Sequence, residues 1–226
     1  MKKFRDVFYI PDKKDGIHVD DLIGNYTLFL NRVGSIARFD FERLKVLKKL
    51  YSSHVELWTQ NDSGMFWLGK SWTSTMGQLG GKDRTGSGVR VAPAYEIYKN
   101  PERWFYAEFE VPDKRYIQLM EFLQTAVKEN AGYDKALIAN FFIPKQIWNF
   151  DKGTQYICNE LCNDGVLLAT RENYDHICTA IRSKLDENYS PILTATTLHY
   201  CGVDFYNMDG NLLLAGFNQN QSTNKN

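Results

Sequence analysis

The segment Trp104–Val111 and the residues directly after it constrain the fold more than any other part of the chain. Its apolar residues alternate with more polar ones, which is the period of a strand with one buried face: Phe105, Ala107, Phe109, Val111. Asp113 then suits the N-cap of a helix to about Asn130, whose apolar residues recur at helical spacing: Ile117, Met120, Leu123, Val127. A half-buried strand followed at once by an amphipathic helix favours an α+β fold.

The same two patterns recur along the chain. We expect further helices at these places: Asp40–Tyr51, from about Cys158, Asn173–Leu185, and after Ser190-Pro191 as N-cap and first helical residue. We expect further strands at these places: Ser53–Trp58, Met65–Leu68, Val89–Ala92, and a hairpin in Val203–Phe217 that turns at Asn207–Gly210. The turn-rich Asn61–Gly64 would join the first two strands. The prediction is therefore an antiparallel sheet packed against helices.

No stretch reads as an interdomain linker, and the six prolines are scattered at element boundaries. We predict a single domain over 1–216 and a disordered polar tail over 217–226, because the tail has no core-forming pattern. The glycine-rich Gly77–Gly88 between two expected strands reads as a mobile loop that could act as a lid.

Composition excludes several classes of protein. The 27 basic and 27 acidic residues cancel, which argues against nucleic-acid binding by bulk electrostatics, and the basic face of Asp40–Tyr51 is expected to be simply solvated. Four cysteines are too few for a disulfide scaffold. The N-terminus lacks an apolar signal region, and the longest apolar runs fall far short of the ~20 residues of a membrane span. We expect a cytoplasmic protein without stable membrane insertion; its oligomeric state stays open.

Familiar cofactor and metal motifs are missing. Gly81-Lys82 would end a phosphate loop, but Met76 stands where the first glycine belongs and Asp83 replaces the Ser or Thr. No G-x-S-x-G, CxxC or HExxH occurs. No cofactor and no metal site is expected.

What remains is one cysteine and one histidine. In Ser52–Trp58, His54, Glu56 and Trp58 share one strand face, and such a polar face suits the wall of a cleft. Cys158 follows a turn-forming stretch and begins a helical pattern, so the helix dipole would stabilise its thiolate and a backbone N–H could serve as an oxyanion donor. The structural alternatives are a small buried thiol and a satisfied strand histidine. The remaining cysteines, Cys162, Cys178 and Cys201, are expected in the core.

The order of these segments resembles the circularly permuted papain-like enzymes, which include the YiiX-like proteins, permuted relatives of the NlpC-type cell-wall peptidases, and lecithin:retinol acyltransferase. In that group the His strand precedes the Cys helix. His54-Val55-Glu56-Leu57 is similar to its His strand, and Tyr156-Ile157-Cys158-Asn159-Glu160-Leu161 to its Cys helix start, with Asn159 in place of the usual Ser. Gly88–Val91 and Asn100–Trp104 resemble segments of uncharacterised phage and bacterial members, and the similarity spans roughly Ile23 to Leu198.

The resemblance implies a permuted papain-like fold and a thiol hydrolase, of amidase, peptidase or acyl-transfer type, that acts on a peptide-like or acyl substrate. Cys158 would be the nucleophile and His54 the base and acid. For the third catalytic residue we favour Glu56, which shares a face with His54; Ser71 and Ser74 are the alternatives. Trp58, Trp67 and Trp72 could form an apolar substrate wall. The rival hypothesis is a non-enzymatic structural or interaction protein on the same scaffold, for which a phage-encoded, virion-associated protein is one form. Membrane or lipid association, as in the acyltransferase relatives, is a third option, but no amphipathic anchor is visible in the sequence.

Overall fold

The computed structural model describes residues 1–11, 19–75, 88–129, 131–132, 156–171, 174–184 and 190–217. Within these residues, seven strands form one antiparallel sheet in the order β4-β3-β2-β1-β5-β6-β7. The strands are β1 (Lys2–Tyr9), β2 (His54–Thr59), β3 (Lys70–Thr75), β4 (Gly88–Pro93), β5 (Trp104–Val111), β6 (Phe205–Asn207) and β7 (Leu212–Leu214).

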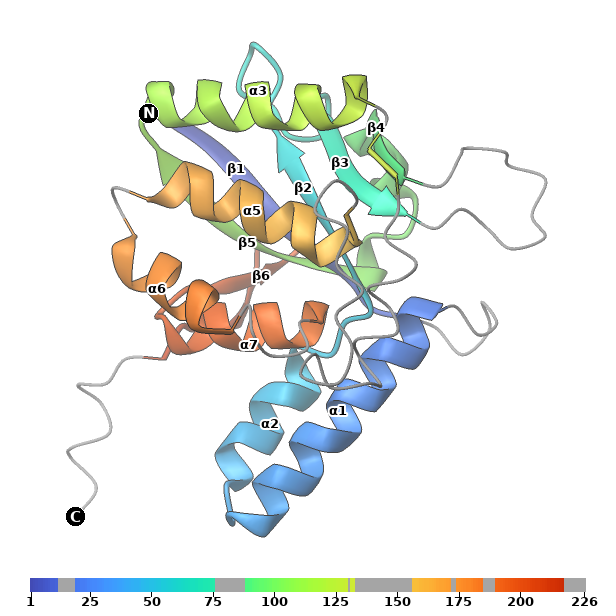
Figure 1. Ribbon diagram of the computed structural model, residues 1–226, viewed down its shortest axis with the longest axis vertical. Helices are drawn as coiled ribbons and strands as arrows, with labels where there is room; N and C mark the ends of the chain where they lie inside the picture. Colours follow the sequence, from blue (N-terminus) through green and yellow to red (C-terminus); the bar gives the residue numbers. More distant parts are fainter. Residues whose placement is uncertain are drawn as a thin grey trace.

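Helices cover one face of this sheet (Figure 1). The helices that the structure describes are α1 (Val19–Ala37), α2 (Phe41–Lys49), α3 (Asp113–Lys128), α5 (Cys158–Thr170), α6 (Asp175–Lys184) and α7 (Pro191–Tyr200), and short 3-10 segments η2 (Ala94–Lys99) and η3 (Pro101–Arg103) precede β5. α3 and α5 lie across the sheet, whereas α1 and α2 project away from it as a helical hairpin. The predicted α+β fold with an antiparallel sheet is confirmed, and none of the helices described is long and apolar enough to cross a membrane.

The main core lies between the sheet and α5, and its centre is the pair β1 and β5. Phe4 stacks on Phe109 with ring centroids 5.0 Å apart, and Phe8 stacks on Phe105 at 5.2 Å. Directly opposed residues of an antiparallel pair lie on the same face of the sheet. The alternating apolar residues of Trp104–Val111 therefore all lie on the face that the helices cover. The period-two pattern thus identified both the strand and its buried face.

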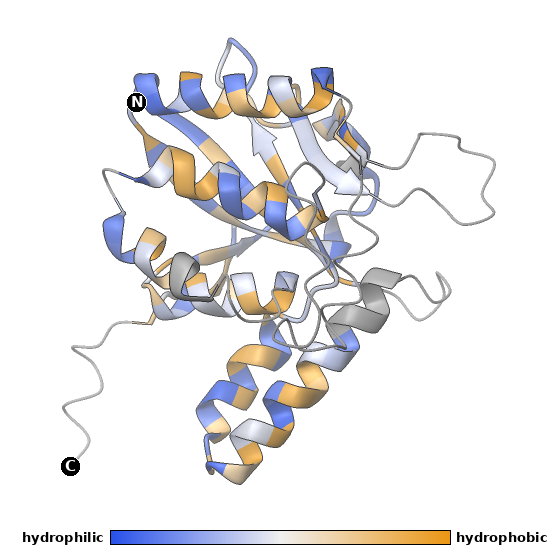
Figure 2. Ribbon diagram, viewed as in Figure 1, coloured by the Kyte–Doolittle hydropathy of each residue, from blue (hydrophilic) through white to orange (hydrophobic). Residues whose placement is uncertain are grey.

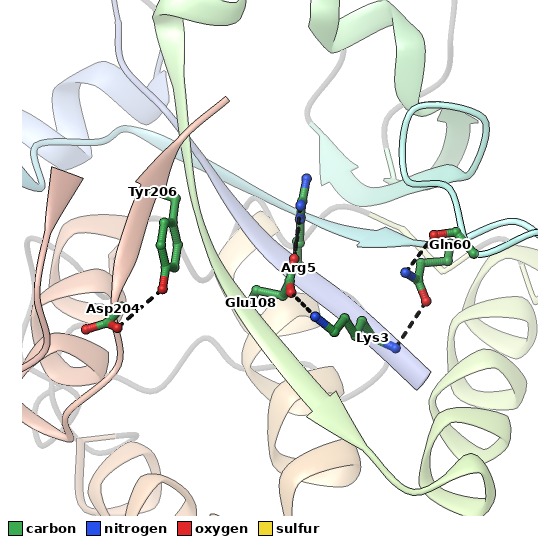
Figure 3. Close-up of polar contacts among 7 residues, drawn as sticks. Lys3, Arg5, Gln60, Glu108, Asp204 and Tyr206 are labelled. Carbon is green, nitrogen blue, oxygen red and sulfur yellow. Dashed lines mark hydrogen bonds and ion pairs between the residues drawn. The ribbon is translucent and has the colours of Figure 1, made fainter. Parts of the chain in front are cut away.

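The opposite face of β1 and β5 carries polar contacts (Figure 3). Lys3 Nζ and Arg5 Nε donate to the two oxygens of Glu108, at 2.7 and 2.9 Å. The Arg5 guanidinium also lies 4.0 Å from the ring centroid of Phe66 and 3.9 Å from that of Tyr106. Cation–π contacts of this kind stabilise a partly desolvated arginine, and here Arg5 lies beside a smaller hydrophobic cluster that includes Val7, Phe66 and Tyr106.

The strand predicted at Met65–Leu68 is wrong, because those residues belong to the loop between β2 and β3. Phe66 folds back onto the outer face of the sheet and is buried, and its carbonyl accepts a hydrogen bond from the N–H of Gly69 at 2.8 Å. A side chain at Gly69 would place its Cβ against the Thr59 carbonyl. The chain therefore turns tightly here, and the second strand begins only at Lys70.

Other boundaries differ by less. Asp40 is the N-cap of α2, and its carboxylate accepts a hydrogen bond from the N–H of Arg43 at 3.0 Å. This agrees with the helix predicted to begin at Asp40. Pro112 rather than Asp113 is the N-cap of α3, and the Asp113 carboxylate lies 3.0 Å from the N-terminal ammonium. Ser190 does precede α7 as its N-cap residue. Apart from Gly88, the predicted Gly77–Gly88 loop lies outside the described residues, as does the tail beyond Phe217.

Candidate active site

Cys158 is the first residue of α5, at the end of the helix that lies beside β2 and β3. The Glu160 carboxylate accepts from the N–H of Ile157 at 3.4 Å, and the Ser74 hydroxyl donates to the carbonyl of Tyr156 at 2.6 Å, so this helix start is held against β3. Farther along α5, a Cβ on Gly165 would lie 2.5 Å from Cδ1 of Leu57. The glycine therefore allows α5 to approach β2 closely.

His54 begins β2 at the point where β2 and β3 separate. Their paired residues are Leu57–Thr59 with Lys70–Trp72; beyond them the Thr73 hydroxyl donates to the carbonyl of Val55 at 3.1 Å. His54 shares its strand face with Glu56, on the side of the sheet away from α5. His54 also interacts with Cys158 at the start of α5, so the imidazole lies at this opening between the two strands.

Cys158 and His54 meet at this opening, where the Cys158 side chain lies close enough to the imidazole to interact with it by charge and by hydrogen bonding. Burial lowers the pKa of His54, but the charge and hydrogen bond of Cys158, followed by those of Glu56, raise it well above its usual value of 6.5. An imidazole flanked by two anionic groups favours its protonated form. The arrangement therefore suits a thiolate–imidazolium pair.

Glu56 continues the hydrogen-bonded chain on the far side of the imidazole. Its Oε1 lies 3.2 Å from His54 Nε2, its Oε2 accepts from the Ser71 hydroxyl, and Nη2 of Arg90 lies 3.7 Å from Oε1. Burial raises the pKa of Glu56, but His54, Ser71 and Arg90 together lower it below its usual 4.5. Glu56 is thus an ionised carboxylate that orients the imidazole and compensates its charge.

The two serines considered as third residues lie elsewhere in this network. Ser71 contacts Glu56 and so acts on the carboxylate, while Ser74 binds the carbonyl before α5. The three tryptophans do not form one substrate wall: Trp58 is buried on the outer face, Trp72 is buried on the helix face, and Trp67 is half exposed in the β2–β3 loop. Cys162 and Cys178 are buried, as expected of core cysteines, and Cys201 is partly buried.

Two residues of the site were missed in the sequence. The Thr73 hydroxyl lies 3.2 Å from His54 Nε2, and Arg90 approaches Glu56 from the neighbouring strand β4. Ser71 and Thr73 are two residues apart and so share a face. The spacing of Ser71 and Thr73 could therefore have indicated that both face the site. Arg90 could not be found in this way, because it reaches Glu56 only through the pairing of β3 with β4, in which Arg90 lies opposite Thr73.

A cavity of about 230 Å³ lies on the face of the sheet away from α5. Glu56, Ser71 and Arg90 line it together with Arg103 and Trp104, whereas Cys158 is not among its lining residues. Cys158 is only 3% exposed. The side chain of Cys158 is therefore almost completely shielded from solvent. Within the described ranges, no three His, Cys, Asp or Glu side chains are grouped so that they could hold a metal ion.

Comparison with known proteins does not identify a family. No family model matches the chain, no curated protein matches it, and no solved structure matches it.

Proposed function

We propose that the protein is a thiol hydrolase or acyltransferase of the circularly permuted papain-like kind, with Cys158 as nucleophile, His54 as base and acid, and Glu56 as the residue that orients the imidazole. One observation carries the proposal: His54 lies between Cys158, at the start of a helix, and the buried carboxylate of Glu56, to which it is hydrogen-bonded. Nucleophile, base and orienting group in contact are the requirements of covalent catalysis by a thiol.

In the first step the Cys158 thiolate attacks the carbonyl carbon of an amide or ester. A bond forms between sulfur and carbon, the bond from carbon to nitrogen or oxygen breaks, and the His54 imidazolium protonates the leaving group. Nε2 is already bound by Glu56 and Thr73, so Nδ1 is the nitrogen that exchanges the proton. The N–H groups of the first turn of α5 are the expected donors to the oxyanion.

In the second step water, or another acceptor, attacks the thioester. His54 takes the proton of the attacking oxygen, the sulfur–carbon bond breaks, and the thiolate returns with release of the acid or the transferred acyl product. No cofactor enters either step. The buried Glu56 stays ionised throughout and stabilises the imidazolium that each half-reaction forms or uses.

The resemblance to the permuted papain-like group supports the proposal independently of these contacts. It rests on the His strand before the Cys helix, and it implies a peptide-like or acyl substrate. The observed α+β fold is compatible with that group.

The test is the pH dependence of alkylation by iodoacetamide, with mass spectrometry to identify the modified cysteine. If His54 holds Cys158 as a thiolate, the rate at about pH 6 stays close to that at about pH 8.5, because the anion is present at both. In His54→Ala the rate should fall on the order of a hundredfold over the same interval, as for a free thiol with a pKa of about 8.5.

Cys201 provides the matched control within the same molecule, because it is partly buried and burial raises its pKa. Its alkylation should be slow at the lower pH in both proteins. The dyad is wrong if Cys158 shows the pH profile of an ordinary thiol and His54→Ala leaves that profile unchanged. Labelling by amide and ester electrophiles, compared with Cys158→Ala, then tests acyl transfer itself.

The burial of Cys158 supports a second candidate function, a non-enzymatic structural or interaction protein on the same scaffold. On that reading the chain Cys158–His54–Glu56 is a satisfied polar network in the core. It predicts no acyl adduct on Cys158 with any electrophile, and unchanged partner binding in Cys158→Ser.

A further inference from the structure

The helical hairpin of α1 and α2 carries large apolar side chains that are exposed. It projects from the body beside α7 (Figure 1), and hydrophobic residues follow both of its helices (Figure 2). The side chains that are at least partly exposed are Phe29, Leu30, Val33, Ile36, Phe39 and Phe41, and Phe39 is the most exposed at 79%. Contiguous apolar patches of this kind on a protein surface usually mark an interaction site.

An amphipathic helix usually buries its apolar face, but α1 exposes it. Thr27, Leu28 and Ser35 face inward and are buried, and Leu28 packs against Leu47 of α2. At 3.6 residues per turn, the exposed Phe29–Ile36 side chains form a stripe about 120° wide on the other side of the helix. Over residues 25–37, the part of α1 whose side chains are described, the more apolar face is therefore the one turned to solvent.

Phe39, at the tip of the hairpin, adds an independent observation. Its φ is +54°, the left-handed region that a bulky residue adopts rarely and that Asn or Gly adopts easily. A phenylalanine here strains the turn, and its ring is too exposed to stabilise the fold in return. The ring of Phe39 is therefore better explained by a contact with another molecule than by the stability of the fold.

The hairpin is also basic, although the whole chain is neutral. Residues 19–49 contain six basic and four acidic side chains, a net charge of +2, and the part nearer the tip, residues 29–49, carries +4, whereas the full sequence has 27 of each sign. Arg38 is exposed beside Phe39 at the tip, and Lys48 and Lys49 are exposed in the last turn of α2, at the end of the hairpin next to the body. Two such hairpins would repel each other, so the charge disfavours a second copy of this chain as the partner.

We propose that the α1–α2 hairpin is a peripheral membrane-binding element, which inserts its apolar tip at Phe39 and Phe41 into the interface of an anionic lipid bilayer. A projecting apolar tip fits the headgroup–acyl boundary, and the surrounding cations fit the negative surface of the leaflet. Nothing in this element spans the membrane; it lies on one leaflet and holds the body of the protein at the surface.

The test is flotation of the full-length protein with vesicles made of phosphatidylcholine and phosphatidylserine in about equal parts, compared with pure phosphatidylcholine. The variant Phe39→Asn with Phe41→Ser removes the tip rings. Because Asn tolerates a positive φ, this variant should fold at least as well as the wild type. Ile117→Asn is the matched control, since Ile117 is 56% exposed, close to the 58% of Phe41, but lies on α3.

The wild type should float with the anionic vesicles, and less so as salt rises. The tip variant should lose at least about tenfold in affinity, Arg38→Ala at the tip about fivefold, and the Ile117→Asn control almost nothing. The proposal is overturned if the tip variant floats like the wild type. It is equally overturned if the wild type ignores both vesicles, or if light scattering shows instead a dimer that the tip variant dissociates, which assigns the surface to a second copy.

Discussion

Asp6 is the residue whose replacement tests the description of the core most directly. It lies in the middle of β1, opposite Leu57 of β2 and Ala107 of β5, on the face that packs under the helices. Its side chain is fully buried, and neither carboxyl oxygen has a hydrogen-bond partner in the described part of the chain. We predict that Asp6→Leu, which keeps the branched shape and removes the polar oxygens, stabilises the protein.

The magnitude follows from the unmade hydrogen bonds and from ionisation. A buried polar group without a partner costs about 1–3 kcal/mol, so the gain should be about 2 kcal/mol even where the carboxyl is neutral. Burial raises the pKa of Asp6 well above 3.8, so above about pH 4 the unfolded state binds fewer protons than the folded state. Wild-type stability therefore falls as pH rises from there to the folded pKa of Asp6, and the advantage of Asp6→Leu grows over that interval.

The assay is urea unfolding and calorimetry at several pH values. A gain of about 2 kcal/mol corresponds to a rise in Tm of about 4–8 °C for a chain of this size. Asp6→Asn is the control: it cannot ionise but still buries an amide, so it should remove the pH dependence without the full gain. A lower Tm for Asp6→Leu at neutral pH would refute the reasoning, because it would mean that the carboxyl has a stabilising partner.

Two further substitutions test the site and the approach of its helix. Glu56→Gln keeps the shape but removes the charge that helps raise the pKa of His54, so that pKa should fall in an NMR titration, and acylation of Cys158 by ester probes should slow by about a hundredfold. An unchanged His54 titration would contradict the role given to Glu56. Gly165→Ala places a Cβ 2.5 Å from Leu57 and should destabilise by about 1–3 kcal/mol in urea unfolding. Gly34→Ala, on α1, is its control and should stabilise slightly, because its Cβ meets no atom closer than 3.4 Å; equal effects of the two would show that the close approach of α5 is not what requires Gly165.

Local patterns were reliable where one face of an element is apolar without interruption. The strand Trp104–Val111 and the helix after it were predicted closely, as were the helix start at Cys158 and the hairpin that turns at Asn207–Gly210. β1 was missed although it is central to the sheet. The physical reason is Asp6, which places a carboxyl between Phe4 and Phe8 on the core face and breaks the expected alternation.

The loop after β2 shows a different limit. Its apolar residues Met65–Leu68 read as a strand, but Phe66 packs on the outer face and Trp67 and Leu68 are exposed. Hydrophobicity alone does not distinguish a strand from a loop that covers a sheet, because both bury side chains. The tight turn at Gly69 against the Thr59 carbonyl is a long-range contact, and no local period reports it.

The sequence by itself determined the type of each strongly periodic element, the start of a helix at Cys158, and the shared face of His54 and Glu56, because these follow from backbone geometry within a few residues. Only the tertiary structure decided that His54 meets Cys158, that Arg90 reaches Glu56, and that α1 turns its apolar face outward. Those facts depend on which distant strands pair and in which register. Sheet order and helix packing are set by the joint burial of many side chains, and no single segment contains that information.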